Sequence, residues 1–183
     1  MKLHFLILGC KPAGRLTEQH DVFFGIGHCL KDLLPQIEAA WPDGGKIHID
    51  SWRAITNVDG YAIKIAEKIT PLSASPKLFF LNLGGYKPND LEEYHYKLFT
   101  VANNKAEAIN KAKQSAFYRH TGFDGANSHI DDKYGVDVDD VYEIEEVLPA
   151  VFKNQYSIVI EKITTPQAED ELHIGYLKLS SLT

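Results

Sequence analysis

Two glutamate–histidine pairs, Glu18 with His20 and Glu93 with His95, are the residues whose types and spacing best suit chemistry. Side chains two positions apart on a β-strand lie on the same face, so each pair would place a carboxylate beside an imidazole. Such a pair can transfer protons or bind a metal ion. The alternative is structural, with histidine anchoring the preceding loop and glutamate orienting it. The structural role is favoured, because few enzymes need two identical sites close together.

A second candidate is an acidic stretch in the last third of the chain. Its members are His129, Asp131, Asp132, Asp137, Asp139 and Asp140. Their oxygen atoms would suit a hard divalent cation such as Ca²⁺ or Mg²⁺. The spacing departs from an EF-hand loop, because Lys133 and Gly135 stand where oxygen side chains are needed. A solvated acidic loop, or a surface for a basic partner, is therefore favoured over a metal site.

Other chemistry has weaker support. Cys10 and Cys29 lack the spacing of a zinc site, and histidines near them in sequence do not establish the geometry of a cysteine nucleophile. The glycine-containing turns at residues 9–15 and 84–87 follow strands, but they match neither a P-loop nor a dinucleotide-binding motif. We expect no bound cofactor, with a divalent cation as the alternative.

The candidate pairs are positioned by a strand motif that occurs twice. Residues 2–10 read KLHFLILGC and residues 77–85 read KLFFLNLGG, 75 positions apart (77 − 2). The same spacing relates Glu18 to Glu93 and His20 to His95. The sequence therefore predicts a first repeat over residues 1–72 and a second over 73–183, with an acidic insertion at about 132–155. We expect the two repeats to pack as one globular unit.

Hydrophobic periodicity predicts the elements of each repeat. Strands are expected at 3–8, 20–27, 46–51, 61–70 with a bulge, 78–83, 94–102, 156–164 and 172–179; helices are expected from 28 to 41, restarting at Pro35, and from 105 to 120 after an Asn104 N-cap. The segments 61–70 and 78–83 are expected to form a hairpin, as are 156–164 and 172–179. The fold class is α+β: a mostly antiparallel sheet with helices packed on one side, built from a duplicated β-β-α-β-β unit with pseudo-two-fold symmetry.

Several segments together resemble a bacterial family known as domain of unknown function 1543, whose members often carry the unit twice. They are KLFFLNLGG, the Glu93–His95 pair, the helix NKAEAINKAKQSAF and the run HIDDKYGVDVDD. The resemblance covers nearly the whole chain, although the first copy has Cys10 where the second has Gly85. The family has no established activity, so the resemblance implies no catalytic residue.

Composition limits the classes of partner. The chain has 183 residues and a net charge of −6, and it contains no cluster of Lys and Arg of the kind that phosphate contacts need. Its apolar runs are too short for a membrane span, and the N-terminal run is too short for a signal peptide. We expect a cytoplasmic protein that binds neither nucleic acid nor membrane; self-association is left open.

Two functions remain. The favoured one is a noncatalytic binding or scaffold module for a small ligand or a protein partner. The rival is a metal-assisted hydrolase, or another enzyme, that uses the Glu-x-His pairs and the aspartates.

Overall fold

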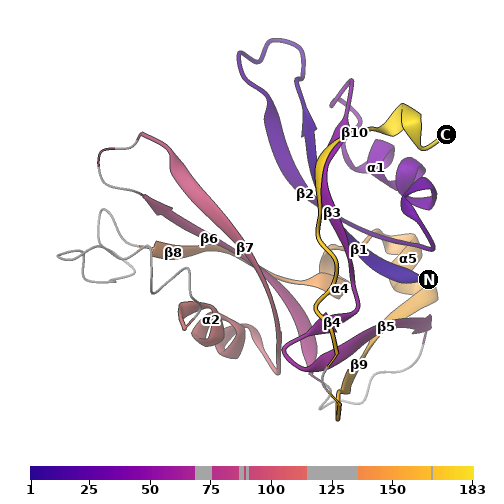
Figure 1. Cartoon of the computed structure of the whole chain (residues 1–183), viewed down its shortest axis with the longest axis vertical. Coiled ribbons are helices and arrows are strands. Elements are labelled where there is room, and N and C mark those ends of the chain that lie inside the picture. Colours follow the sequence, from indigo (N-terminus) through magenta and orange to yellow (C-terminus); the bar gives the residue numbers. More distant parts are fainter. Residues whose placement is uncertain (69–75, 87–88, 90, 115–135, 166) are drawn as a thin grey trace. The chain divides into compact units, whose positions relative to one another are not determined.

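The computed structural model describes residues 1–68, 76–86, 89, 91–114, 136–165 and 167–183. These residues belong to two compact units. Unit 1 contains Met1–Ile69 and Leu148–Thr183, and unit 2 contains Thr70–Val147. The described strands all pair in antiparallel fashion and are accompanied by short helices, which gives an α+β fold with mostly antiparallel sheets (Figure 1).

Unit 1 contains two sheets. The larger has the strand order β10-β3-β1-β2, and the smaller has the order β4-β5-β9. The elements are β1 (Lys2–Cys10), β2 (Gln19–Gly27), η1 (Leu30–Leu33), α1 (Leu34–Ala40), β3 (His48–Ile55), β4 (Asn57–Val58), β5 (Tyr61–Glu67), α5 (Ala150–Gln155), β9 (Tyr156–Lys162), β10 (His173–Lys178) and η2 (Leu179–Ser181).

The centre of unit 1 is β1, which is apolar on both faces and is buried along almost its whole length. One of its faces packs against α1. The core at this contact is Leu6, Leu8, Phe23, Leu33, Ile37 and Ile49. Pro35 lies in the first turn of α1, where its missing N–H costs no hydrogen bond, so the expected helix restart is confirmed.

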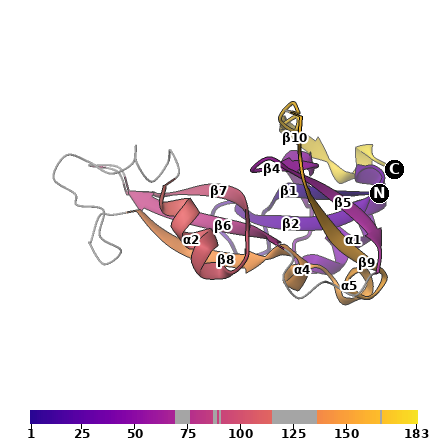
Figure 2. The ribbon, with the colours of Figure 1, turned by 90° about the horizontal axis from the view of Figure 1, so that it is seen from below.

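Unit 2 contains one three-stranded sheet, with the order β7-β6-β8, and two described helices. The elements are β6 (Lys77–Tyr86), β7 (Glu93–Ala102), α2 (Lys105–Lys113), β8 (Val136–Glu143) and α4 (Ile144–Val147). Helix α2 lies along the sheet (Figure 2), and its fully buried Ala108 and Ala112 pack against Phe79, Leu81 and Leu83.

The start of α2 was predicted correctly. The Asn104 side chain accepts a hydrogen bond of 2.9 Å from the Glu107 backbone N–H, and the Glu107 carboxylate accepts one of 3.0 Å from the Asn103 backbone N–H. The bond from the Asn103 backbone lowers the pKa of the Glu107 carboxyl. The bond to Asn104 satisfies one of the backbone donors that a helix start leaves free. The part of the expected helix beyond Gln114 lies outside the described residues.

The two units share a hairpin register. Strand β1 pairs with β2 from Lys2–Gly27 to Cys10–Gln19, and β6 pairs with β7 with every partner shifted by the same 75 positions, beginning at Lys77–Ala102. The third strand also matches. The β1–β3 register slips between Ile7 and Leu8, and the β6–β8 register slips between the equivalent residues, Asn82 and Leu83. Equal registers are what a duplicated unit predicts; the pseudo-two-fold packing of the repeats stays a prediction.

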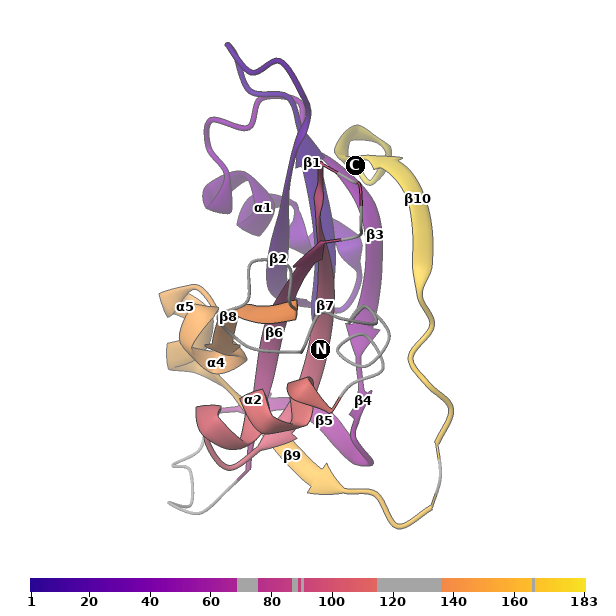
Figure 3. The same ribbon diagram turned by 90° about the vertical axis from the view of Figure 1, so that its left-hand side faces the viewer.

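Two expected hairpins are wrong. Strand β5 pairs with β4 and β9 instead of β6, because both edges of β6 are occupied by β7 and β8. Strand β10 pairs with β3 instead of β9, and Figure 3 shows it running beside β3. Strand β5 contains no bulge either, since it pairs with β9 without interruption from Tyr61–Lys162 to Glu67–Tyr156.

The described part of the acidic stretch is a strand, whereas a solvated loop was expected. Its described part contains β8, whose Val138 and Val141 pack against the core of unit 2. The boundaries of the predicted repeats and of the insertion at 132–155 are not decided by this structure.

None of the helices in the described part of the chain combines the length and apolar composition that a membrane crossing requires.

Candidate functional site

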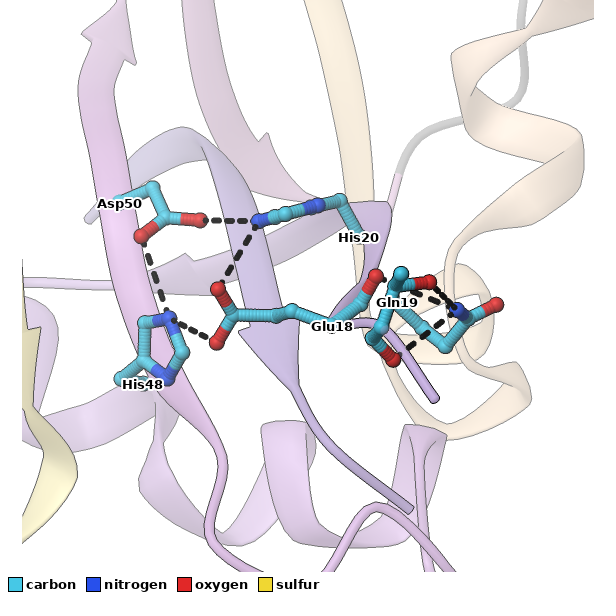
Figure 4. Close-up of polar contacts among 6 residues, drawn as sticks. Glu18, Gln19, His20, His48 and Asp50 are labelled. Carbon is cyan, nitrogen blue, oxygen red and sulfur yellow. Dashed lines mark hydrogen bonds and ion pairs between the residues drawn. The ribbon is translucent and has the colours of Figure 1, made fainter. Parts of the chain in front are cut away.

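The Glu18–His20 pair of unit 1 does not stand alone. His48 and Asp50, from the start of β3, face it across the sheet, and the four side chains form a ring of alternating imidazoles and carboxylates (Figure 4). We call these four residues the unit 1 cluster. It combines two nitrogen donors with two carboxylates at one end of the β1–β2–β3 sheet.

The distances in the unit 1 cluster are similar around the ring. His48 Nε2 is 3.2 Å from Glu18 Oε1 and 3.2 Å from Asp50 Oδ1. His20 Nε2 is 3.2 Å from Asp50 Oδ2 and 3.7 Å from Glu18 Oε2. The inner side is fixed and the outer side is open, because the His48 side chain is only 5% exposed whereas those of Glu18 and His20 are 46% and 51% exposed.

Local backbone features bring the four side chains together. At the register slip, Ile7 pairs with Ser51 and Leu8 with Ile49, so Asp50 is the extra residue of a bulge. His48 and Asp50 are two positions apart, so strand alternation already places them on the same face. The bulge adds a local change in side-chain direction at Asp50. The Gln19 amide donates to the carbonyl oxygens of Thr17 and Glu18 and holds the bend that precedes β2.

Gly9 makes room for the unit 1 cluster. It pairs with His20 on one side and with His48 on the other. A Cβ at this position would lie within 3.0 Å of the His48 imidazole and of Asp50 Oδ2. Gly9 was expected to end its strand; instead it lies inside β1, and its missing side chain lets the imidazole and the carboxylate settle against the backbone.

The C-terminal strand β10 covers His48. Its own register slip falls between Ile174 and Leu177, where Gly175 has a φ of 141°, a conformation that glycine adopts without strain. This bulge places Tyr176 on His48, with ring centroids 4.2 Å apart. The contact helps to fix the imidazole plane, and Tyr176 itself remains 64% exposed.

Unit 2 builds a related cluster at the equivalent place. Asp139 is the extra residue of the β8 bulge, and its Oδ2 lies 3.2 Å from His95 Nδ1. A Cβ at Gly84 would come within 3.0 Å of carboxylate oxygens of both Asp139 and Glu93. Glu93, His95 and Asp139 form what we call the unit 2 cluster. Its histidine has an additional partner, because His95 Nδ1 lies 3.1 Å from the Asn82 side-chain nitrogen.

The structure separates the other candidate metal ligands. Asp137 pairs with Gly84 in the strand register, the position that His48 has opposite Gly9 in unit 1. Asp140 accepts a hydrogen bond of 3.1 Å from the Tyr142 hydroxyl. The remaining three, His129, Asp131 and Asp132, lie outside the described residues. Of the two aspartates whose side chains the structure describes, Asp139 joins the Glu93–His95 pair and Asp140 contacts Tyr142.

The cysteines lie outside the clusters. Cys10 is fully buried, and burial, together with the Asp43 and Glu18 carboxylates, raises the pKa of its thiol. A raised pKa keeps the thiol protonated and unreactive. Cys29 is exposed at the start of η1.

Sequence reasoning missed the roles of His48 and Asp50. The triplet His48-Ile49-Asp50 recurs at residues 129–131, but neither residue of the first copy was considered as a site residue. The usable signal was its composition, a histidine and an aspartate at the start of a short strand. The bulge at Asp50 could not be seen.

The segment that contains the unit 1 cluster matches a known protein family. Residues 15–65 match the family model of the Domain of Unknown Function DUF1543. This segment is similar to the DUF1543 family. The expected family resemblance is thereby confirmed, and the DUF1543 segment contains all four residues of the unit 1 cluster.

One solved structure resembles the whole chain. Protein Il1583 from Idiomarina loihiensis is 23% identical, with 97% of each chain covered and a TM-score of 0.66. At this identity the likeness shows the fold alone. No curated protein matches the chain.

Proposed function

We propose that the protein is a noncatalytic binding module that holds a ligand, either a small molecule or a group on a protein partner, at its imidazole–carboxylate clusters. The observation that carries the proposal is that both units place the same three groups above a strand glycine, a glutamate and a histidine from the second strand and a bulged aspartate from the third.

The charge of the clusters indicates the chemistry of the ligand. In unit 1, Glu18 and Asp50 carry two negative charges beside two imidazoles, which are neutral when unprotonated. Glu18 and His20 keep about half of their side-chain surface exposed, so a ligand can approach. A cationic group, or one rich in hydrogen-bond donors, complements this arrangement.

The arrangement also favours binding over catalysis. Cys10 is buried with a raised pKa, so the thiol closest in sequence to Gly9 is unsuited to nucleophilic attack. Two copies of a binding cluster give a partner two points of attachment, which increases avidity without new contacts.

A metal-assisted hydrolase is the second candidate, and one observation favours it. The unit 1 cluster brings two imidazoles and two carboxylates together, and a metal held there could activate water with a carboxylate as general base.

A single set of variants separates the two functions. Amine, guanidine and basic-peptide probes would be screened by thermal shift against the wild type, Glu18→Gln and Glu93→Gln, with p-nitrophenyl acetate and p-nitrophenyl phosphate tested as substrates. The control is Glu161→Gln, an exposed carboxylate paired with Lys64 away from both clusters. Binding that is lost in the cluster variants, without turnover, supports the proposal. Turnover that disappears in Glu18→Gln would establish the enzyme instead.

A further inference from the structure

We propose that the unit 1 cluster binds one divalent first-row transition metal ion, with Glu18, His20, His48 and Asp50 as its protein ligands. The proposal deepens the binding function above by naming the ligand class, and it therefore rests on that function.

His48 gives the first reason. Its side chain is only 5% exposed, and its Nε2 atom is buried without a hydrogen-bond partner. This nitrogen lies 3.2 Å from a carboxylate oxygen of Glu18 and 3.2 Å from one of Asp50, yet neither contact has hydrogen-bond geometry. A single N–H group cannot be well aligned with two oxygens on different sides at once, and here it is aligned with neither. A metal ion between the three atoms attracts all of them.

Asp50 gives the second reason. Its Oδ2 atom is also buried without a hydrogen-bond partner, 3.2 Å from His20 Nε2. Buried polar atoms are normally hydrogen-bonded, because leaving one unpaired costs about 1–3 kcal/mol. Two such atoms on adjacent members of one cluster, beside a glycine that leaves space for them, point to an ion as the missing partner.

The nitrogen–oxygen distances around the ring are close to those between neighbouring ligands of a metal ion, although each carboxylate contributes both of its oxygens to them. Zinc binds imidazole nitrogen and carboxylate oxygen at about 2.1 Å, so neighbouring ligands around a tetrahedral zinc ion lie about 3.4 Å apart. The four nitrogen–oxygen distances of the cluster are 3.2, 3.2, 3.2 and 3.7 Å.

The cluster is poised for an ion but not yet closed around one. No three histidine, cysteine, aspartate or glutamate side chains in the described parts of the chain are already placed to hold a metal ion. His48 is fixed by burial and by Tyr176, and Asp50 is held in the β3 bulge. Glu18 and His20 are half exposed and can turn inward, so two fixed and two movable ligands would complete the shell on binding.

The donor set selects the class of metal. Imidazole suits Zn²⁺, Fe²⁺ and Ni²⁺, whereas Mg²⁺ and Ca²⁺ prefer oxygen ligands alone. Two imidazoles beside two carboxylates therefore favour a transition metal over the hard cations that the acidic stretch suggested. Unit 2 provides the contrast, because Asp137 has the strand position of His48 and His95 is already paired with Asn82 and Asp139.

The test is calorimetric titration of the full chain, freed of metal by a chelator, with ZnCl₂, MnCl₂ and MgCl₂. We expect one zinc or manganese ion per chain at the higher-affinity site and much weaker magnesium binding. His20→Gln should reduce the zinc affinity at least by the roughly 10–100-fold that loss of a second-shell partner costs, since it removes a ligand itself. His20 is half exposed, so the variant should fold; His48→Gln, which alters a buried side chain, serves as the second variant.

His95→Gln is the matched control, because it changes the equivalent histidine of unit 2. Its zinc affinity should stay within about twofold of the wild type. The proposal is overturned if zinc and manganese bind no better than magnesium, or if His95→Gln weakens zinc as much as His20→Gln does. If the cationic organic probes still bind in a Glu18-dependent manner while metals do not, only the metal assignment fails. If neither binds, the binding function fails as well.

Discussion

The two units build the same hairpin and the same bulge, and they differ in what surrounds them. Unit 1 places His48 beside its bulged Asp50 and covers the histidine with Tyr176 of β10. In the described part of unit 2, Asp137 takes the histidine position and the sheet has three strands, without an equivalent of β10. The shared frame thus holds a four-membered cluster with a buried histidine in one unit, and the three-membered unit 2 cluster in the other.

This difference separates the residues that both units share, which we call the frame, from the residues that distinguish the unit 1 cluster. The strand glycine, the bulged aspartate and the Glu-x-His pair occur in both units, so they belong to the frame. Only His48 and its Tyr176 cover are peculiar to unit 1. A duplicated frame can keep its geometry while one copy acquires a different chemistry, because a single change at the position opposite the glycine alters the donor set.

The largest effect should come from the centre of each sheet. Leu6 and Leu81 are equivalent residues of β1 and β6, and both are fully buried. Leu6→Ala and Leu81→Ala should each lower the free energy of unfolding by about 2–5 kcal/mol, through lost burial and a residual cavity. Urea denaturation of the two variants measures the change in the free energy of unfolding. A loss below about 1 kcal/mol in one variant alone would show that the two central strands are not equivalent.

The glycines should distinguish the clusters. In Gly9→Ala the new methyl group meets the buried His48 ring, which has nowhere to go, and we expect a loss of about 1–3 kcal/mol. In Gly84→Ala it meets Glu93 and Asp139, and Glu93 is exposed and can turn aside, so the loss should stay below about 1 kcal/mol. Thermal unfolding of both variants is the measurement, and equal losses would mean that the unit 1 cluster is no more rigid than its counterpart.

Much of this frame was readable from the sequence. The 75-residue spacing predicted equivalent strands, and these pair in one shared register because each hairpin is local and its register follows from the turn and the apolar pattern. The Asn104 cap and the helix restart at Pro35 were also predicted, since both depend on neighbouring residues alone.

Long-range pairing was not readable. Strand β5 finds β9, and β10 finds β3, across many intervening residues, and nothing in an alternating apolar pattern says which sheet edge a distant strand will choose. The prediction of the site was limited for the same reason. Glu18 and His20 were predicted because they are close in sequence, whereas His48 and Asp50 reach them only through the β1–β3 register and its bulge.

The C-terminal segment of unit 1 makes a further contact through Asp170. Asp170 accepts hydrogen bonds from the backbone N–H groups of Thr56 and Asn57, at 2.8 and 3.2 Å, and from the Thr56 hydroxyl at 2.5 Å. Asp170→Asn should cost about 1.5 kcal/mol, because hydrogen bonds to a charged acceptor are replaced by weaker ones. If this contact positions β10, limited proteolysis should also cut the segment after Asp170 faster. An unchanged cleavage rate would show that β10 is held by its pairing with β3 alone.

The smallest effect concerns an ion pair present in unit 2. Lys77 Nζ lies 2.7 Å from Glu143 Oε2, and the equivalent positions in unit 1 are Lys2 and Ala54. The hydrogen bond to Glu143 raises the pKa of Lys77. A raised lysine pKa means that the charged form is stabilised by folding, so this contribution is complete below the unfolded value of about 10.4 and disappears as the pH rises through the folded value.

We therefore expect Lys77→Met to lose less than about 1 kcal/mol at neutral pH, because the lysine side chain is 49% exposed and solvent weakens the pair. The difference from the wild type should shrink above about pH 10.4. Lys2→Met is the matched control, and its effect should not depend on pH in this way, since Ala54 supplies no carboxylate. Urea denaturation at pH 7 and pH 11 measures the loss in the free energy of unfolding. The same loss at both pH values would show that Lys77 contributes through packing of its aliphatic stem. The charge of Glu143 would then not be what distinguishes the two units.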